Sequence, residues 1–154
     1  MMTHAPTLAR GYGVMAGYLD DPEATRQAID SGGWLHTGDL GAIDHHGRLK
    51  IIGRKKDMFI VGGFNAYPAE IESFLLEHPA VQQAAVIGVP DERLGQVGKA
   101  FIVRKGRKDD DVTADELIAW AKARMAGFKA PRYVEFLHAL PLNATGKVMK
   151  DQLK

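Results

Sequence analysis

Lys147, near the C-terminus, is the residue of this sequence with the clearest chemical potential. It ends a polar turn from Pro141 to Lys147 with the sequence PLNATGK, in which Asn and Gly favour a tight reversal of the chain. An ammonium group presented on such a turn can stabilise negative charge that develops on phosphate oxygens. The same residues also describe an ordinary solvated turn, so the interpretation depends on the residues that accompany Lys147.

Two familiar nucleotide-binding motifs do not explain this turn. It ends like a P-loop, but Pro141 stands where the first glycine of that loop is required and Val148 where its Ser or Thr is required. The segment 11–16 fits G-x-G-x-x-A, yet Gly17 and Tyr18 follow it and no strand-turn-helix context surrounds it. The G-x-S-x-G motif of serine hydrolases is absent.

Three further polar segments lie upstream. Asp39 follows a glycine, and its carboxylate can accept hydrogen bonds from both hydroxyls of a ribose; alternatively, it is a turn aspartate at the end of a hairpin. The segment 53–57, GRKKD, concentrates charge where the chain is expected to divide, although a solvated linker would have the same composition. Gly62 and Gly63 allow close approach of a thin ligand or, equally, a tight turn.

The elements that position these residues differ on the two sides of this division. Upstream, an acidic start before Pro22 predicts a helix over 22–29, and strands over 40–43 and 49–52 flank a turn at 44–47, as in a β-hairpin. His45 and His46 are adjacent in this turn, so their side chains diverge. No further ligand cluster is evident, and no metal site is expected.

Downstream, the pattern alternates strands with amphipathic helices. The spacing from Thr113 to Glu116 is that of a capping box, and Pro68 favours the start of another helix. We predict an α+β fold in which an antiparallel sheet packs against helices, preceded by the β-hairpin region. The predicted elements are strands at 58–61, 84–89, 100–103 and 133–137, a loop at 90–95, and helices at 68–78, 113–127 and 148–153.

Composition excludes several classes of protein. The chain has 45% hydrophobic and 25% charged residues with a formal net charge of +1, a balance typical of a soluble globular domain and without the basic excess of a nucleic-acid-binding protein. It has no cysteine, which removes disulfides, thiolate catalysis and zinc-thiolate sites. Neither a signal peptide nor a transmembrane segment is apparent, so we expect a cytoplasmic protein.

In combination and in this order, the polar segments resemble the C-terminal region of the adenylate-forming enzymes, the ANL superfamily of acyl-CoA synthetases, peptide-synthetase adenylation domains and luciferases. The similarity runs from about Arg10 to the end of the chain, and within the superfamily it is greatest to bacterial fatty-acyl-CoA ligases and related carboxylate-CoA ligases. The segments that carry it are 14–18, 33–39, 53–60, 62–72, 88–95 and 141–147.

The resemblance implies a reaction in two halves. ATP and a carboxylic acid form an acyl-adenylate and pyrophosphate, after which the CoA thiol attacks the acyl carbon and AMP leaves. By this resemblance Lys147 reaches the acyl carboxylate and the α-phosphate, Asp39 holds the ribose hydroxyls, and Arg54 also contacts the nucleotide. ATP with Mg²⁺ and CoA are therefore expected to bind the intact enzyme, and none of them is expected to bind tightly to this chain.

The resemblance also implies a hinge and a CoA site. Lys56, with Asp57 beside it, matches the position about which the small domain rotates between the half-reactions, so that different faces of this domain serve adenylation and thioester formation. Gly62 and Gly63 then line the path of the pantetheine arm.

A weaker part of the resemblance concerns the CoA nucleotide. Phe128 and Lys129 align with a segment that touches this nucleotide in some members of the superfamily. Ala130 replaces a basic residue that some relatives have there.

The expected organisation is a remnant of the large N-terminal domain over 1–53, a hinge over 54–57 and a C-terminal lid domain over 58–154. The phosphate loop, adenine pocket and acyl tunnel of the family have no counterpart here, so we expect the chain to need an N-terminal adenylation domain as its partner and to be inactive in adenylation alone. The alternative is a non-catalytic interaction or CoA-binding module with the same fold. Retention of Lys147, Asp39, Arg54 and Asp57 argues against that alternative.

Overall fold

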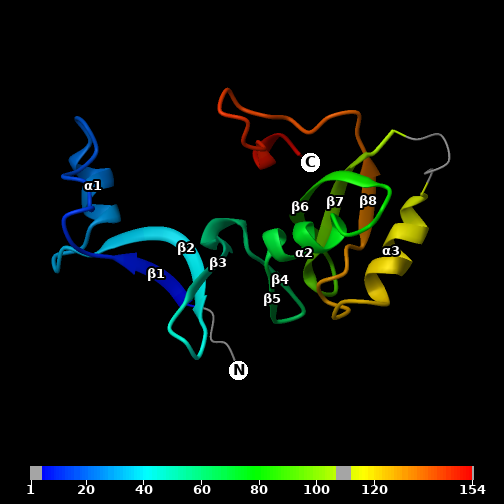
Figure 1. The fold of residues 1–154 in the computed structure, drawn as a ribbon, viewed down its shortest axis with the longest axis horizontal. Coiled ribbons are helices and arrows are strands. Elements are labelled where there is room, and N and C mark those ends of the chain that lie inside the picture. The colour runs from blue at the N-terminus through cyan, green and yellow to red at the C-terminus, as the bar shows by residue number, and fades with distance from the viewer. Residues whose placement is uncertain (1–4, 107–111, 154) are drawn as a thin grey trace. The chain divides into compact units, whose positions relative to one another are not determined.

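The computed structural model describes residues 5–106 and 112–153 (Figure 1). The chain divides into two compact units, residues 1–56 and residues 57–154. We refer to them as unit 1 and unit 2. Among the described helices, none is long and apolar enough to cross a membrane.

Unit 1 is a three-stranded antiparallel sheet with one short helix. The strands β1 (Ala5–Ala9), β2 (Leu35–Ile43) and β3 (Leu49–Arg54) pair in the order β1-β2-β3, and α1 (Pro22–Ala28) lies between β1 and β2 in the chain. The predicted helix is confirmed, because Asp21 caps it by accepting a 2.8 Å hydrogen bond from the backbone of Ala24, and Pro22 occupies the first turn. Strand β1 was not predicted.

The predicted hairpin of unit 1 is also confirmed. Between β2 and β3, one carboxylate oxygen of Asp44 accepts hydrogen bonds from the backbone N–H groups of His46 and Arg48. Gly47 has a φ of +78°, a conformation that glycine adopts without strain. An aspartate and a glycine therefore make the reversal, and the neighbouring histidines are turn residues.

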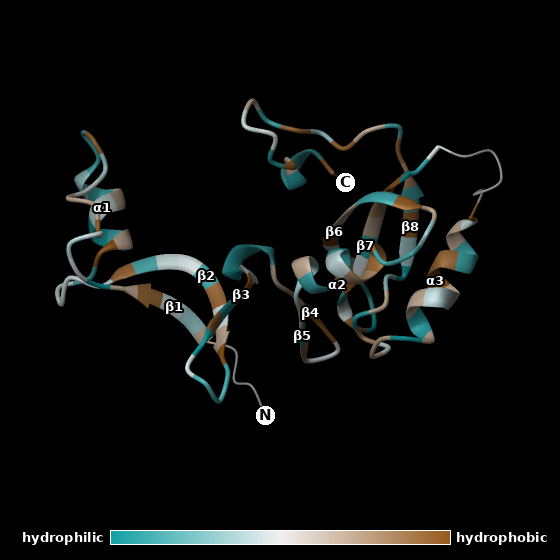
Figure 2. Cartoon of the chain, in the orientation of Figure 1, coloured by the Kyte–Doolittle hydropathy of each residue, from teal (hydrophilic) through white to brown (hydrophobic). Residues whose placement is uncertain are grey.

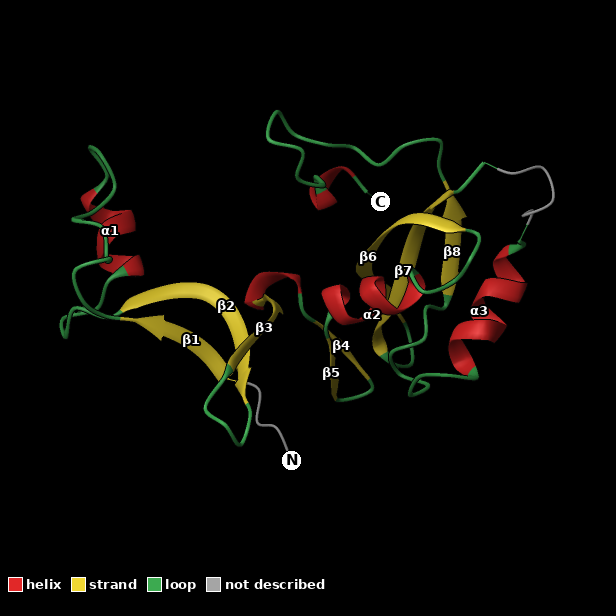
Figure 3. Ribbon diagram, viewed as in Figure 1, coloured by secondary structure: helices red, strands yellow, loops and turns green. Residues whose placement is uncertain are grey.

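Unit 2 has one mixed sheet that carries two helices on one face (Figure 3). Its strands pair in the order β5-β4-β7-β6, and β8 also pairs with β7. The α+β class is confirmed, but β8 runs parallel to β7 instead of antiparallel, because the crossover through α3 returns the chain in the same direction. The elements of unit 2 are β4 (Phe59–Val61), β5 (Phe64–Ala66), α2 (Pro68–Leu75), β6 (Val81–Asp91), β7 (Gly95–Arg104), α3 (Ala114–Lys122), β8 (Tyr133–Phe136) and the short helix η2 (Lys150–Gln152). Another short helix, η1 (Lys55–Asp57), spans the division between the units.

Local signals in the sequence explain helix α3 of unit 2. Thr113 and Glu116 form the predicted capping box, each side chain accepting a hydrogen bond from the backbone of the other residue. Figure 2 shows hydrophilic and hydrophobic bands alternating around α3, and Leu117 and Ala121 form its buried face. The helix ends at Lys122, short of the predicted Gly127.

Alternation along the long hairpin β6–β7 gives the sheet two buried faces. Ala100 and Ile102 lie in a cluster with residues of α2 and α3. Phe101 and Val103 point to the opposite face, where they pack with Leu140 and Leu153 of the C-terminal segment. Both faces are thus covered, one by helices and the other by a segment that Figure 3 draws mostly as loop.

Candidate functional site

Asp39 and Arg54 lie opposite each other at one end of the β2–β3 pair in unit 1. The guanidinium Nε is 3.0 Å from one carboxylate oxygen, and the side chains retain 55% (Arg54) and 30% (Asp39) of their exposure. Gly38, at a φ of +76°, precedes Asp39, whose backbone N–H donates to the hydroxyl of Thr37. The bond uses one carboxylate oxygen and one guanidinium nitrogen, so accessible acceptor and donor groups remain for a ligand.

The predicted hinge residues lie where the chain divides. Lys55 to Asp57 form the short helix η1, and the division between the two units falls between Lys56 and Asp57. Lys56 is exposed and Asp57 is partly exposed. Their role as a hinge stays a prediction.

Gly62 and Gly63 form the two-residue turn of the β4–β5 hairpin. Both have positive φ, +55° and +88°, and Val61 pairs with Phe64, as in the primed turns that favour glycine at both central positions. The backbone N–H of Gly62 donates a 2.9 Å hydrogen bond to the carbonyl of Leu94. The tight-turn interpretation therefore holds, and the turn is fixed against the β6–β7 hairpin.

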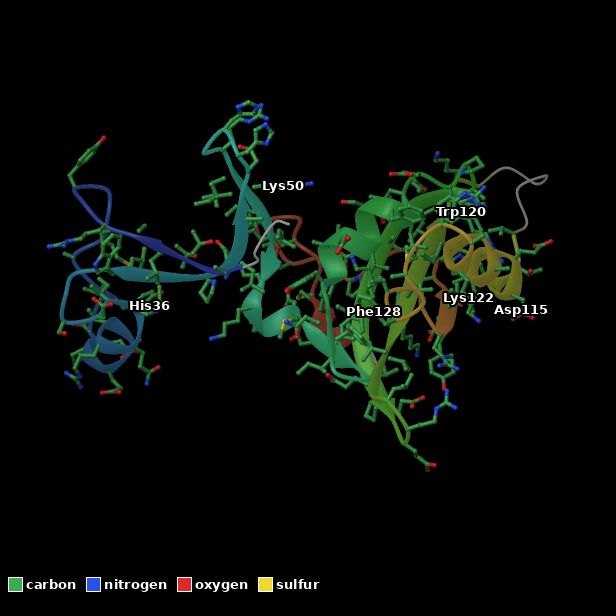
Figure 4. The ribbon with its side chains drawn as sticks, turned by 90° about the horizontal axis from the view of Figure 1, so that it is seen from below. His36, Lys50, Asp115, Trp120, Lys122 and Phe128 are labelled. Carbon is green, nitrogen blue, oxygen red and sulfur yellow. The ribbon has the colours of Figure 1, made fainter. Side chains whose placement is uncertain are left out.

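A cavity of about 250 Å³ opens beside this turn. Gly62 and Phe128 both line it, so the structure brings together these two predicted CoA-binding residues, and Phe128 is labelled in Figure 4. The rings of Phe64 and Phe128 stack with centroids 4.9 Å apart. Gly63 is not among the lining residues. Lys129 also lies outside the lining and forms an ion pair of 2.6 Å with Glu70.

Phe64, Leu94 and Arg132 are among the lining residues of this cavity that sequence reasoning did not assign to a site. Phe64 directly follows the glycine pair, which is a usable signal, whereas Leu94 and Arg132 come from distant parts of the chain. Asp91 fixes the turn that carries Leu94, because the backbone N–H of Leu94 donates to its carboxylate and lowers its pKa. The nearby charge of Arg132 lowers the pKa of Asp91 further.

The turn that carries Lys147 is closed by hydrogen bonds around Asn143. Its side-chain oxygen accepts from the backbone N–H groups of Thr145 and Lys147, at 3.0 and 2.9 Å, and its backbone N–H donates to the Lys147 carbonyl. Gly146 has a φ of +78°. The turn is exposed, as expected, and these bonds give it a defined shape.

The ammonium group of Lys147 differs from those of Lys129 and Lys150. Lys129 is paired with Glu70 and Lys150 with Glu72, each at 2.6 Å. Within residues 5–106 and 112–153, no carboxylate pairs with Lys147. An exposed cation at the end of a defined turn is available to an external anion.

A metal centre has no support in the described part of the chain, where no group of three or more His, Asp or Glu residues could hold a metal ion. The candidate functional groups are a carboxylate and a guanidinium in unit 1 and, in unit 2, an apolar cavity and an ammonium that has no carboxylate partner among the described residues.

Comparison with known proteins assigns the chain to a family. The model for the AMP-binding enzyme C-terminal domain matches residues 70–147, which end at Lys147. The chain belongs to this family. The resemblance to the adenylate-forming enzymes is confirmed, because curated relatives of the chain are CoA ligases and its structural neighbours include adenylate-forming enzymes.

Relatives of this family member include a methyl-dioxo-octahydro-indenyl-propanoyl:CoA ligase of Mycobacterium tuberculosis, 56% identical over 96% of the chain and 29% of the relative. The long-chain-fatty-acid--CoA ligase of Escherichia coli is 43% identical over 94% of the chain and 25% of the relative. The chain thus spans less than a third of the length of these relatives.

A solved structure, the o-succinylbenzoate CoA synthetase of Bacillus subtilis in complex with an acyl-adenylate intermediate, has a TM-score of 0.90 and 40% identity over 99% of the chain and 30% of that protein. The same enzyme has also been solved with ATP and a magnesium ion.

Proposed function

We propose that this chain is the C-terminal part of an ATP-dependent acyl-CoA ligase, which forms an acyl-adenylate and then an acyl-CoA thioester. The relatives that support the proposal are CoA ligases, and one neighbour holds an acyl-adenylate. Fatty acids are the proposed substrate class. ATP with Mg²⁺ and CoA are the proposed ligands of the complete enzyme, together with an N-terminal adenylation domain.

The observation that carries the proposal is the state of Lys147. Its turn is held in shape by Asn143, yet its ammonium has no carboxylate partner among the described residues. We assign to it the contact with the acyl carboxylate and the α-phosphate during adenylation. As the carboxylate attacks and pyrophosphate leaves, negative charge grows on the oxygens of the α-phosphate. A cation placed in advance stabilises this transition state more than it stabilises the ground state.

Asp39 and Arg54 are the proposed nucleotide-binding pair. The partly exposed carboxylate fits a ribose because it can accept from two hydroxyl groups, and the guanidinium, which cannot lose its proton, suits a site close to phosphates. Their mutual ion pair orients both groups before a ligand binds. The donor and acceptor set of unit 1 therefore fits AMP.

We assign the second half-reaction, thioester formation, to the predicted hinge and CoA-binding residues. Rotation about Lys56 and Asp57 would exchange the Lys147 turn for the Gly62–Gly63 turn. The two glycines give the pantetheine arm a backbone surface without side chains, and the stacked Phe128 offers an apolar face beside the cavity. Lys129 contributes charge at this site, although its ion pair with Glu70 must loosen for direct contact with phosphate.

ATP–pyrophosphate exchange tests the proposal. The chain is joined to the N-terminal part of the Mycobacterium tuberculosis ligase in place of that enzyme's own matching 148 residues, and exchange is measured with the parent enzyme's carboxylic acid. We expect exchange by the joined protein and none by the chain alone. The parent enzyme rejoined at the same junction is the positive control, and an inactive joined protein beside an active control contradicts the proposed function.

Single substitutions in the joined protein then test the role of Lys147 in adenylation. Lys147→Ala is expected to remove exchange, whereas the matched control Lys122→Ala, at the exposed end of α3, retains it. Equal activity of the two variants would overturn the role of Lys147. Exchange by the chain alone would overturn the statement that it does not adenylate.

A further inference from the structure

The segment that carries Lys147 contains little regular secondary structure of its own. After β8, the chain from Leu137 to Leu153 forms only the turn and the short helix η2. Two apolar side chains anchor it, because Leu140 before the turn and Leu153 after it are buried against β6 and β7. Apolar contacts are not directional, so they hold the segment to the sheet without setting the direction of the turn.

A third anchor is polar and comes from a distant part of the chain. The ammonium of Lys150 lies 2.6 Å from Oε1 of Glu72 on α2. The two side chains retain only 24% and 19% of their exposure. The same carboxylate oxygen accepts a 2.8 Å hydrogen bond from the backbone N–H of Val86. One atom of Glu72 therefore joins α2, β6 and η2.

The position of Val86 explains why a largely shielded carboxylate lies there. Strand β6 lies at the edge of the described sheet, so it pairs with β7 on one side and with no described strand on the other. Its residue Val86 is fully buried. An unpaired backbone N–H at such a place would cost free energy. Glu72 satisfies this group, and Lys150 in turn neutralises the charge that Glu72 brings into a shielded environment.

Hydrogen bonds transmit the position of Lys150 to the turn. The residue before it, Met149, donates its backbone N–H to the carbonyl of Pro141 at 2.8 Å, and Leu142 pairs with Val148. These contacts form the base of the turn, and Asn143 closes its tip by accepting from the N–H of Lys147. A fixed Lys150 consequently fixes the base from which Lys147 projects.

We propose that Glu72 and Lys150 are positioning residues that set the direction in which the turn presents Lys147. The inference rests on the proposed function for its chemical consequence, since a displacement of about 1 Å at a reacting group lowers a rate by roughly a hundredfold. Neither residue touches the reacting atoms in this account. Their ion pair acts on adenylation through Lys147 and leaves thioester formation alone.

The structural part is tested on the chain alone by NMR measurement of amide hydrogen exchange. Lys150→Met and Glu72→Gln each remove the ion pair, but the glutamine oxygen still accepts from Val86. We expect exchange of the Lys147 and Met149 amides to accelerate about tenfold in both variants, while the Val86 amide stays protected. The matched control is Glu135→Gln, which breaks the ion pair between Lys99 and Glu135 on β7 and β8.

The result that overturns the positioning role is unchanged exchange at Lys147 and Met149 in both variants, or the same acceleration in the Glu135→Gln control. Lys150→Arg keeps a cation that can reach the carboxylate. It is therefore expected to restore slow exchange, and failure of this rescue would also contradict the proposal.

The catalytic part is tested in the joined protein. Lys150→Met is expected to lower the rate of acyl-adenylate formation about tenfold or more, with Lys150→Arg close to the unsubstituted protein. The conversion of added acyl-adenylate to acyl-CoA should not change. Equal losses in both half-reactions would show a general structural defect and overturn the proposal. If the unsubstituted joined protein is inactive, the proposed function fails. The amide hydrogen exchange measured on the chain alone still decides the positioning role.

Discussion

The two units of this chain differ in how their residues are buried. Among the described residues of unit 1, the buried apolar side chains are Leu40 and Ala42, and large apolar side chains such as Ile43 and Leu49 remain exposed. Unit 2 buries apolar clusters on both faces of its sheet. A small sheet with so little buried surface is expected to be marginally stable, so we expect unit 2 to contribute most of the stability of the chain.

The chain has two tryptophans, one in each unit, which makes this comparison measurable. Trp34 directly precedes β2 in unit 1, and Trp120 lies on α3 in unit 2. In a Trp34→Phe background, fluorescence follows the unfolding of unit 2; in a Trp120→Phe background, it follows unit 1. Each substitution below can therefore be assigned to the unit that it destabilises.

The largest difference is expected between two leucines. Leu117 in unit 2 is fully buried and Leu49 in unit 1 is 53% exposed. Leu117→Ala should lower the free energy of unfolding of unit 2 by about 2–5 kcal/mol, because it leaves a cavity, whereas Leu49→Ala should change that of unit 1 by no more than about 0.5 kcal/mol. Urea titrations with the two fluorescence probes measure both changes in the free energy of unfolding. Similar losses in the two units would contradict the proposed difference in burial between them.

The second effect concerns the glycine turn. Gly62 has a φ of +55°, and a Cβ there would lie 3.2 Å from a methyl carbon of Leu94. Gly62→Ala should therefore destabilise unit 2 by about 1–2 kcal/mol. Gly127→Ala is the matched control, since a Cβ at that position meets open space. Urea unfolding followed at Trp120 gives both values, and a neutral Gly62→Ala would contradict the strained geometry.

A smaller loss is expected at the start of α3. Thr113→Ala removes the acceptor for the backbone N–H of Glu116, and such caps contribute about 1 kcal/mol. The loss should be detected at Trp120 and not at Trp34. An equal change at both probes would show that the two units unfold together, which would contradict a separate stability for each unit.

The smallest effect is a pH dependence in unit 1. Hydrogen bonds to Asp44, first that from the backbone of Arg48, lower the pKa of its carboxyl below the ordinary 3.8. The ionised form thus stabilises the hairpin fully above pH 3.8, and this contribution is lost as the pH falls through the lower folded-state value. Asp44→Asn should lower stability at pH 7, and the difference should vanish in acid. A difference that does not depend on pH would refute this.

The sequence predicted the elements whose signals are local. The capping box at Thr113, the proline at the start of α2 and the acidic residues before Pro22 were sufficient to place the starts of these helices. Strand β5 was not predicted, although the tight turn considered at Gly62 and Gly63 is typical of a two-residue hairpin with a second strand after it. Here the signal was present and was interpreted too narrowly.

Other features depend on contacts between residues far apart in the chain. The parallel pairing of β8 with β7 follows from a helical connection. The ion pair between Glu72 and Lys150 spans 78 residues, and neither residue stands out in the sequence. The resemblance supplied Lys147, but the contacts that position it required the structure.

The central claim is that Lys147 serves the first half-reaction and not the second. The most direct test follows both halves in the joined protein by rapid quench. Lys147→Ala should slow formation of the acyl-adenylate by about a hundredfold to a thousandfold, while added acyl-adenylate and CoA still give acyl-CoA at the rate of the unsubstituted protein. Unchanged adenylate formation, or an equal loss in both halves, would contradict the account.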